Sequence, residues 1–275
     1  MINFLRFFHK NFLHLLNYLL LKTSGSLYCF LFNINFYLQK ISTRAKYKSG
    51  FYNFFDNNFS IFVINKRYGF FAYCNGLTKR ALWLHEDYCV DQINFQSNDV
   101  IIDCGANVGD FYLKFKFLNI NIKYYAFEPG FQEMKCLKKN IKNQKLSSVA
   151  LFNQNKIMNF YYKPSNADNS LIKMKNFSTE YSVEAKRLDF VIKDNVKIKL
   201  FKVEAEGAEP EVLQGAINVL KNIEYICVDC SPERGEEQKD TLHEVQTILL
   251  KNNFSIIKFN KNSYRILAKN LVNLS

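Results

Sequence analysis

Asp99-Val-Ile-Ile-Asp103-Cys-Gly105-Ala-Asn107-Val-Gly109 is the stretch of sequence that decides the fold of this 275-residue chain. An apolar run of strand-forming residues ends in an acid, and a glycine-rich turn then opens a helix. A second apolar strand, residues 122–127, ends in Glu128. In a doubly wound sheet, this βαβ step brings the glycine turn and Glu128 to the carboxyl edge of the sheet, where nucleoside-containing cofactors bind. Gly105 and Gly109 let the backbone turn tightly, and Glu128 can accept hydrogen bonds from both ribose hydroxyls.

The spacing of this loop favours S-adenosylmethionine over a dinucleotide. A dinucleotide site usually has the pattern G-x-G-x-x-G, with a helix N-terminus facing the pyrophosphate. This chain instead has D-x-G-x-N-x-G, with Asp103 at the strand end and Asn107 in place of a glycine. A carboxylate there suits a cationic or zwitterionic ligand better than a phosphate. The alternatives are a nucleotide dehydrogenase, or a strand-turn-helix in which the glycines serve the backbone geometry alone.

Composition and charge limit the class of protein. The chain is 48% hydrophobic and 16% aromatic, which is typical of a globular protein with a large core. The net charge of 37 − 25 = +12 favours an anionic partner: nucleic acid, anionic lipid head groups or a phosphorylated substrate. The seven cysteines are odd in number and scattered, which indicates reduced thiols in a cytosolic protein. Strand alternation directs Cys227 and Cys230 to opposite faces, so we predict no metal site.

The N-terminal segment predicts an amphipathic helix over residues 1–22. Its apolar residues are interrupted by a polar stripe at helical spacing, made of Asn3, Arg6, Lys10, His14 and Asn17. Such interruptions are too frequent for a membrane-spanning helix. The helix can lie in a membrane interface with its basic stripe toward anionic head groups, or it can pack on the catalytic domain or a second subunit. We therefore expect a cytoplasmic protein. If the helix lies in a membrane interface, the protein would be bound peripherally to the inner face of the membrane.

The rest of the chain predicts a mainly parallel sheet flanked by helices. Residues 59–63 and 70–73 resemble a hairpin, and a helix follows over 79–88, on which His85 is interpreted as a surface histidine. After Glu128, the predicted strands are 148–153, 157–162, 198–203, 223–229, 253–258 and 263–268, with helices between most of them. Residues 166–170 form a polar loop.

Several segments, taken in order, resemble the FkbM family of S-adenosylmethionine-dependent methyltransferases. They are Val100 to Gly109, Ala126-Phe-Glu-Pro129, Leu188-Asp189, and Lys202 through Gly215-Ala216. The resemblance covers roughly residues 60–270. It implies a Rossmann-like class I methyltransferase fold: an α/β fold whose seven-stranded, mostly parallel sheet has helices on both faces and one antiparallel strand near its edge. We therefore expect an N-terminal amphipathic helical extension over 1–50 and a class I methyltransferase domain over 51–275.

The resemblance also implies O-methylation, commonly of sugar hydroxyls. Carried over by position, Asp103 and Gly105 would hold the methionine end of S-adenosylmethionine and Glu128 its ribose. The loop between them adds Ala106, Asn107 and Gly109 to the predicted cofactor-binding residues. The expected substrate is a sugar hydroxyl of a cell-surface glycan or of its nucleotide-sugar precursor.

The catalytic candidates are Glu204 and Glu206, at the carboxyl end of the strand 198–203. A sugar hydroxyl is a poor nucleophile, so a carboxylate that accepts its proton would help. Glu replaces the usual Asp of the family at 204, and Glu209, next to Pro210, is expected to interact with a helix dipole. Two alternatives stay open: a non-catalytic, membrane-associated binding protein with a methyltransferase-like fold, and a nucleic-acid methyltransferase. Nucleic acid has little support, because we find no base-methylating or RNA-binding motif.

Overall fold

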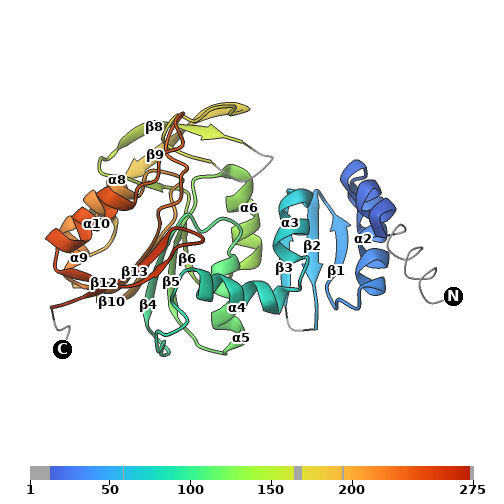
Figure 1. Ribbon diagram of the computed structural model, residues 1–275, viewed down its shortest axis with the longest axis horizontal. Coiled ribbons are helices and arrows are strands. Elements are labelled where there is room, and N and C mark those ends of the chain that lie inside the picture. Colours follow the sequence, from blue (N-terminus) through green and yellow to red (C-terminus); the bar gives the residue numbers. More distant parts are fainter. Residues whose placement is uncertain (1–12, 58, 164–168, 194, 273–275) are drawn as a thin grey trace. The chain divides into compact units, whose positions relative to one another are not determined.

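The computed structural model describes residues 13–57, 59–163, 169–193 and 195–272 (Figure 1). Its internal contacts divide the chain into two units, Met1–Arg80 and Ala81–Ser275. The domain boundary at residue 50 stays a prediction, and the strands between residues 51 and 63 belong to the first of these two units. Residues 1–12 of the predicted N-terminal helix, and most of the predicted loop 166–170, lie outside the described residues.

The N-terminal unit packs two helices and a further short helix around a three-stranded antiparallel sheet. Residues 13–22 are helical, and the other elements are α2 (Gly25–Leu38), β1 (Arg44–Lys48), β2 (Phe51–Phe55), β3 (Ser60–Val63) and α3 (Lys66–Tyr73). The sheet order is β1-β2-β3. Its core is aromatic: Phe32 and Phe36 of α2 are stacked with ring centroids 3.8 Å apart, and Phe32 meets Phe54 of β2 edge-on.

The predicted hairpin over 59–63 and 70–73 is wrong, because its second half is the helix α3. Asn65 precedes this helix, and its side-chain oxygen accepts hydrogen bonds from the backbone N–H groups of Arg67 and Tyr68. This N-cap provides a hydrogen-bond acceptor for backbone N–H groups of the first helical turn, which have no acceptor within the helix. Gly69 and Tyr73, four residues apart, are the buried residues of α3, so the helical period decides which side chains face the core.

The second unit is built on a seven-stranded sheet in the order β12-β13-β11-β10-β4-β5-β6. Its strands are β4 (Val100–Cys104), β5 (Lys123–Phe127), β6 (Lys145–Ser147), β10 (Ile198–Val203), β11 (Ile223–Asp229), β12 (Phe254–Asn260) and β13 (Arg265–Asn270). The neighbouring strands β11, β10, β4, β5 and β6 pair in parallel. Strand β13 runs antiparallel to both β11 and β12. The predicted α/β fold, with one antiparallel strand near the edge of the sheet, is confirmed.

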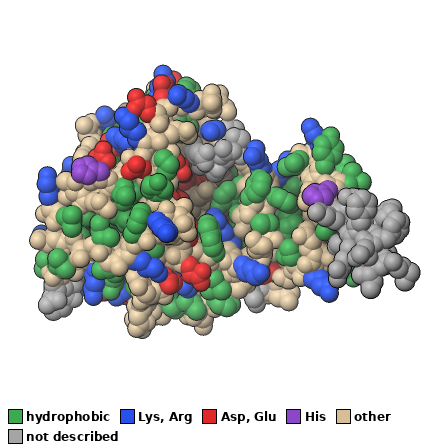
Figure 2. All heavy atoms as spheres, in the orientation of Figure 1, with side chains coloured by type: hydrophobic (Ala, Val, Ile, Leu, Met, Phe, Trp, Pro, Cys, Tyr) green, Lys and Arg blue, Asp and Glu red, His purple; other side chains and the backbone are tan. Residues whose placement is uncertain are grey.

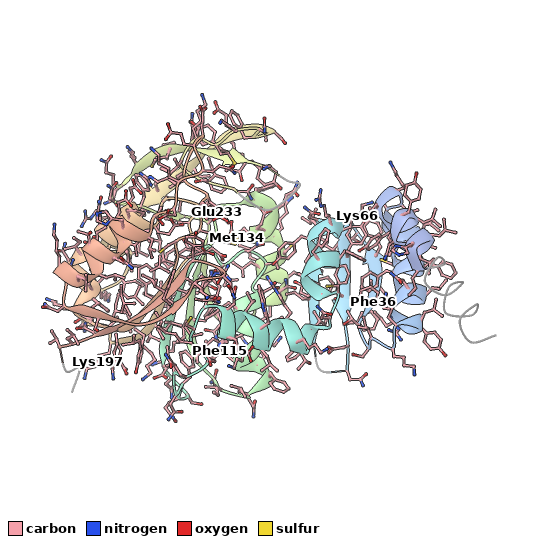
Figure 3. All side chains as sticks on the ribbon, viewed as in Figure 1. Phe36, Lys66, Phe115, Met134, Lys197 and Glu233 are labelled. Carbon is pink, nitrogen blue, oxygen red and sulfur yellow. The ribbon has the colours of Figure 1, made fainter. Side chains whose placement is uncertain are left out.

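Helices cover both faces of this sheet (Figure 1). One face carries η1 (Asp110–Tyr112), α5 (Leu113–Phe117), α6 (Phe131–Asn140) and the C-terminal part of α4 (Leu77–Asp87). The other carries α7 (Leu188–Val191), α8 (Glu209–Gln214), α9 (Ile217–Leu220) and α10 (Leu242–Lys251). Phe115 and Met134, labelled in Figure 3, belong to the first core. Each fully buried side chain of this size contributes about 1.5–3 kcal/mol through the hydrophobic effect.

The two cores test two smaller predictions. Cys227 packs in the core beneath α5 and α6, and Cys230 in the core beneath α8 and α10, so the expected opposite orientation is confirmed. The prediction that His85 lies on the surface is wrong. Its side chain is fully buried and stacked on the ring of Phe111, with centroids 4.4 Å apart. Burial lowers the pKa of His85 to about 3, so it is a neutral core residue.

A small sheet lies beside the main one, in the order β7-β9-β8. Its strands are β7 (Ala150–Leu151), β8 (Lys156–Tyr162) and β9 (Thr179–Lys186). The strand predicted over 148–153 contains only β7 of the small sheet, and the strand that joins the main sheet here is β6, which ends before it at Ser147. The hydroxyl of Tyr181 in β9 accepts a hydrogen bond from the backbone N–H of Phe131, 3.2 Å away. This bond fixes the small sheet at the start of α6, next to Glu128. Within the described residues, no helix combines the length and apolar character that crossing a membrane requires.

Candidate active site

The glycine-rich loop after β4 lies directly against the loop after β10. Gly105 has φ +74°, and a Cβ placed on it would lie 2.0 Å from the backbone oxygen of Glu204. Any other residue would clash with that backbone, so the close approach of the two loops requires glycine here. The backbone N–H groups of Gly105 and Ala106 both donate to the carbonyl oxygen of Phe127, at 2.9 and 3.1 Å. The ends of β4, β5 and β10 thereby form one edge.

Glu128 is joined to this loop by its carboxylate. One oxygen accepts a hydrogen bond from the backbone N–H of Asn107 at 2.8 Å, and the other accepts from the N–H of Gly130 at 2.7 Å. Asn107 adopts φ +49°, in the left-handed region of backbone conformation. Burial raises the pKa of Glu128 to about 8, and the nearby Glu133 carboxylate adds to the shift. The structure therefore brings the predicted loop residues and Glu128 together.

Asp103 has a different environment from the one expected. Its side chain is fully buried. One carboxylate oxygen lies 2.8 Å from Nζ of Lys202, and the other accepts a hydrogen bond from the hydroxyl of Tyr124. Both oxygens are thus engaged inside the protein. Direct contact between Asp103 and a cofactor stays a prediction, and the observed contacts give Asp103 the role of holding Lys202.

Lys202, on the central strand β10, connects the predicted residues. Its Nζ lies 3.0 Å from a carboxylate oxygen of Glu204 and donates to the carbonyl oxygen of Gly105 at 3.1 Å. Burial lowers the pKa of this ammonium group, but the carboxylates of Asp103 and Glu204 outweigh that effect and raise its pKa well above the ordinary value. One buried cation therefore fixes the glycine loop, Asp103 and Glu204 relative to one another.

Arg265, on β13, is the second cation at this edge. Its guanidinium lies 2.7 Å from a carboxylate oxygen of Asp229 and 3.3 Å from one of Glu204, and it also pairs with Asp87. Glu204 therefore bridges Lys202 and Arg265. The Tyr88 ring lies next to both cations. Its centroid is 4.1 Å from the guanidinium carbon of Arg265 and 5.2 Å from the ammonium nitrogen of Lys202.

We name these six charged residues the edge network: Asp87, Asp103, Glu204, Asp229, Lys202 and Arg265. With every group ionised, two cations and four carboxylates give 2 − 4 = −2. A formal excess of negative charge at the carboxyl edge is complementary to a ligand that carries an amino group and a sulfonium, and it would oppose a pyrophosphate.

The remaining acids of this segment have separate surroundings. Glu206 adopts φ +50°, and its carbonyl oxygen accepts a hydrogen bond from the hydroxyl of Ser170 at 2.7 Å. Glu209, at the start of α8, turns its carboxylate back onto its own loop and accepts from the N–H groups of Ala205 and Gly207, at 2.9 and 3.0 Å. Burial raises the pKa of Glu209 to about 7. Glu209 thus shapes the loop that carries Glu204 and Glu206. Among the described residues, no group of three or more His, Cys, Asp and Glu side chains could hold a metal ion.

Sequence reasoning gave no role to Lys202 and did not find Arg265, Tyr124 or Asp87. A lysine in an otherwise apolar central strand is one signal that could have been used, because a buried lysine needs a carboxylate partner. Arg265 had no such signal. Its contact with Asp229 depends on the antiparallel register that pairs these two residues across β11 and β13.

Comparison with known proteins agrees with this geometry. The sequence pattern of the methyltransferase FkbM domain matches residues 103–256, from Asp103 into β12. The chain belongs to the FkbM methyltransferase family. S-adenosylmethionine is the methyl donor of this family, so residues 103–256 form an S-adenosylmethionine-dependent methyltransferase domain.

The individual proteins that resemble this chain are more distant. Methyltransferase sdnD from Sordaria araneosa is 30% identical over 167 residues, which cover 47% of this chain and 64% of that protein. The chain thus matches just under two thirds of the length of this relative. The N-terminal domain of human METTL16, solved with S-adenosylhomocysteine, aligns with a TM-score of 0.38 at 12% identity, covering 72% of this chain and 70% of that one. M. capricolum TrmK, also solved with S-adenosylhomocysteine, aligns with a TM-score of 0.36 at 14% identity over 69% and 68%. Likeness at this level identifies no shared substrate.

The residues of this FkbM domain fit the donor. Glu128 already accepts hydrogen bonds on both carboxylate oxygens and stands where ribose hydroxyls could add to them. With all of its carboxylates ionised, the edge network would complement the charge of the amino and sulfonium groups, although burial raises the pKa of Asp229 to about 8.

Proposed function

We propose that the protein is an S-adenosylmethionine-dependent O-methyltransferase that methylates a sugar hydroxyl of a cell-surface glycan or of its nucleotide-sugar precursor. The observation that carries this proposal is the pair Glu204 and Glu206, which follows β10 directly beside the glycine loop. A hydroxyl oxygen attacks only if its proton is removed, and a carboxylate at this edge can accept that proton.

The two glutamates have different roles in this proposal. Lys202 and Arg265 already engage both oxygens of Glu204. A carboxylate between two cations is a weaker base but a well-fixed hydrogen-bond acceptor. We therefore assign Glu204 to orienting the acceptor and Glu206 to accepting the hydroxyl proton as the new C–O bond forms.

The donor and the rest of the site complete the reaction. When bound, S-adenosylmethionine supplies an electrophilic methyl group on a sulfonium. Glu128 would hold its ribose, and the edge network would balance its positive charge. The protein then contributes alignment of the acceptor oxygen with the methyl carbon, the factor on which an in-line displacement most depends.

Cofactor binding is tested first, by calorimetry with S-adenosylhomocysteine and with NAD. We expect S-adenosylhomocysteine alone to bind, and Glu128→Ala to abolish binding. NAD binding in its place would overturn the proposal.

Acceptor chemistry is tested with methyl-labelled S-adenosylmethionine and a panel of nucleotide sugars and glycans. We expect label in an ether linkage, a fall of about 10²-fold in kcat for Glu206→Gln, and mainly a higher acceptor KM for Glu204→Gln. Glu224→Gln is the matched control, because Glu224 lies toward the opposite end of β11 and pairs with Lys199. Transfer to RNA, or unchanged kcat in Glu206→Gln, would refute the assignment.

A further inference from the structure

The two N-terminal helices expose an unusual number of large apolar side chains. Six of them, each between 52% and 71% exposed, form what we name the outer face: Leu15, Tyr18, Leu21, Leu27, Phe30 and Tyr37. The first three lie at three-residue spacing on the helix 13–22, and the last three follow a single side of α2. No charged residue occurs between Gly25 and Leu38, so no charge on α2 interrupts this face.

The outer face is not the side by which the helices hold the unit together. Leu16 and Leu20 of the first helix, and Phe32 and Phe36 of α2, are buried instead. The two helices are also fixed to each other, because the Asn35 side-chain amide donates to the side-chain oxygen of Asn17 at 2.8 Å. The core of the unit is therefore complete without the outer face, and water-exposed apolar area of this kind marks an interaction surface.

The charge of the chain is concentrated in the same unit. Residues 1–80 contain eleven Lys and Arg and one acid, Asp56, which gives 11 − 1 = +10. Residues 81–275 contain the other 26 basic and 24 acidic residues, which gives 26 − 24 = +2. Figure 2 shows green hydrophobic and blue basic side chains over the described part of the N-terminal unit. Lys22, Lys40 and Lys46 are exposed there, and the Lys22 ammonium lies 5.9 Å from the Tyr18 ring centre.

We propose that the outer face docks on the surface of a bilayer that contains anionic lipids. Its leucine and aromatic side chains would enter the interface, and Lys22 with the other basic residues of the unit would meet the head-group phosphates. A second copy of this chain is a poor occupant, because it would bring another +10 against the first. Nucleic acid fits less well, since half of the outer face, made of Leu15, Leu21 and Leu27, offers neither stacking surfaces nor hydrogen bonds to it. The proposal concerns the N-terminal unit alone and is independent of the acceptor proposed above.

Vesicle sedimentation of the full chain tests the proposal. We expect retention on vesicles of equal parts phosphatidylcholine and phosphatidylglycerol, weak retention on phosphatidylcholine alone, and a decrease with added salt. The double substitution L21E/F30E should weaken binding to the anionic vesicles by at least about tenfold, because it removes two inserted side chains and adds two charges repelled by the lipid. Both positions are exposed, so an unchanged circular dichroism spectrum should accompany the loss.

The matched control is I157E/F190E, which makes the same change in charge at two exposed apolar positions of the second unit. It should bind like the unmodified chain. Equal binding to both vesicle types, or equal weakening by both double substitutions, would overturn the proposal. A mixed-sequence RNA that binds the chain and L21E/F30E alike, while anionic vesicles fail to bind, would overturn it as well and assign the charge to nucleic acid.

Discussion

Replacing Lys202 by methionine tests whether one buried cation holds the candidate site together. The substitution preserves most of the side-chain volume but removes the ammonium group that contacts Asp103 at 2.8 Å and Glu204 at 3.0 Å. Lys202 is 3% exposed and Asp103 is fully buried, so solvent cannot replace the lost contact. Removing one partner of a buried ion pair costs about 3–5 kcal/mol, because the other charge is left in a low-dielectric surrounding.

Thermal or urea unfolding followed by tryptophan fluorescence measures this loss. Trp83 is the one tryptophan of the chain and lies in the second unit, so its signal reports the unit that contains Lys202. At about 2–4 °C per kcal/mol for a unit of this size, we expect the melting temperature to fall by roughly 6–20 °C. The difference should narrow as the pH decreases, because burial raises the pKa of Asp103 and, without its cation, the carboxyl group takes up a proton more readily.

Lys199→Met is the matched control. Lys199 lies on the same strand and pairs with Glu224 at 2.9 Å, but the two side chains are 19% and 32% exposed. A partly solvated pair of this kind contributes about 0–1 kcal/mol. If Lys202→Met and Lys199→Met lower the stability equally, the edge network does not organise the site and the reasoning is refuted.

Two further predictions concern the loop and the acid beside it. Gly105→Ala should lower the free energy of unfolding by about 3 kcal/mol or more, because it adds a backbone clash with Glu204 to the strain of a positive φ. Gly235→Ala, at φ +69° with ordinary contacts, should lower it by only about 1–2 kcal/mol. Equal losses of stability in the two variants would contradict the close approach of Gly105 to Glu204. Glu128, with its pKa raised to about 8, keeps a proton that the unfolded chain loses near 4.5, so stability should fall as pH rises between these values, by up to about 1.4 kcal/mol per unit. Denaturation at pH 5, 6.5 and 8 should show this slope reduced in Glu128→Gln, and an unchanged slope would be evidence against the burial of a protonated acid. Over the same range, S-adenosylhomocysteine should bind more tightly as pH rises, because ribose hydroxyls donate to an ionised carboxylate; an affinity that is flat with pH would contradict this.

Local patterns were enough to predict the elements around the cofactor loop. The strands at 198–203 and 223–229 begin and end where the sequence places them, because both are apolar runs bounded by polar turns. The approach of Glu128 to the loop was predictable as well, since both lie within one βαβ step. The N-terminal hairpin failed because the Asn65 cap and the spacing of Gly69 and Tyr73 specify a helix, against the strand propensity of the aromatic residues between them.

The chain order of short, strongly patterned segments determined the fold class, the family and the loop residues that we predict to bind the cofactor, because those residues lie close together in the sequence. Tertiary structure alone decided the edge network. Lys202 and Asp103 are 99 positions apart, and Arg265 meets Asp229 only through the register of two antiparallel strands. The residues that the folded chain packs against a charged side chain decide whether it forms a buried ion pair or stays on the surface. Ion pairs between residues so far apart in the sequence leave no periodic pattern along the chain. The burial of His85 was decided in the same way, by the Phe111 ring packed upon it.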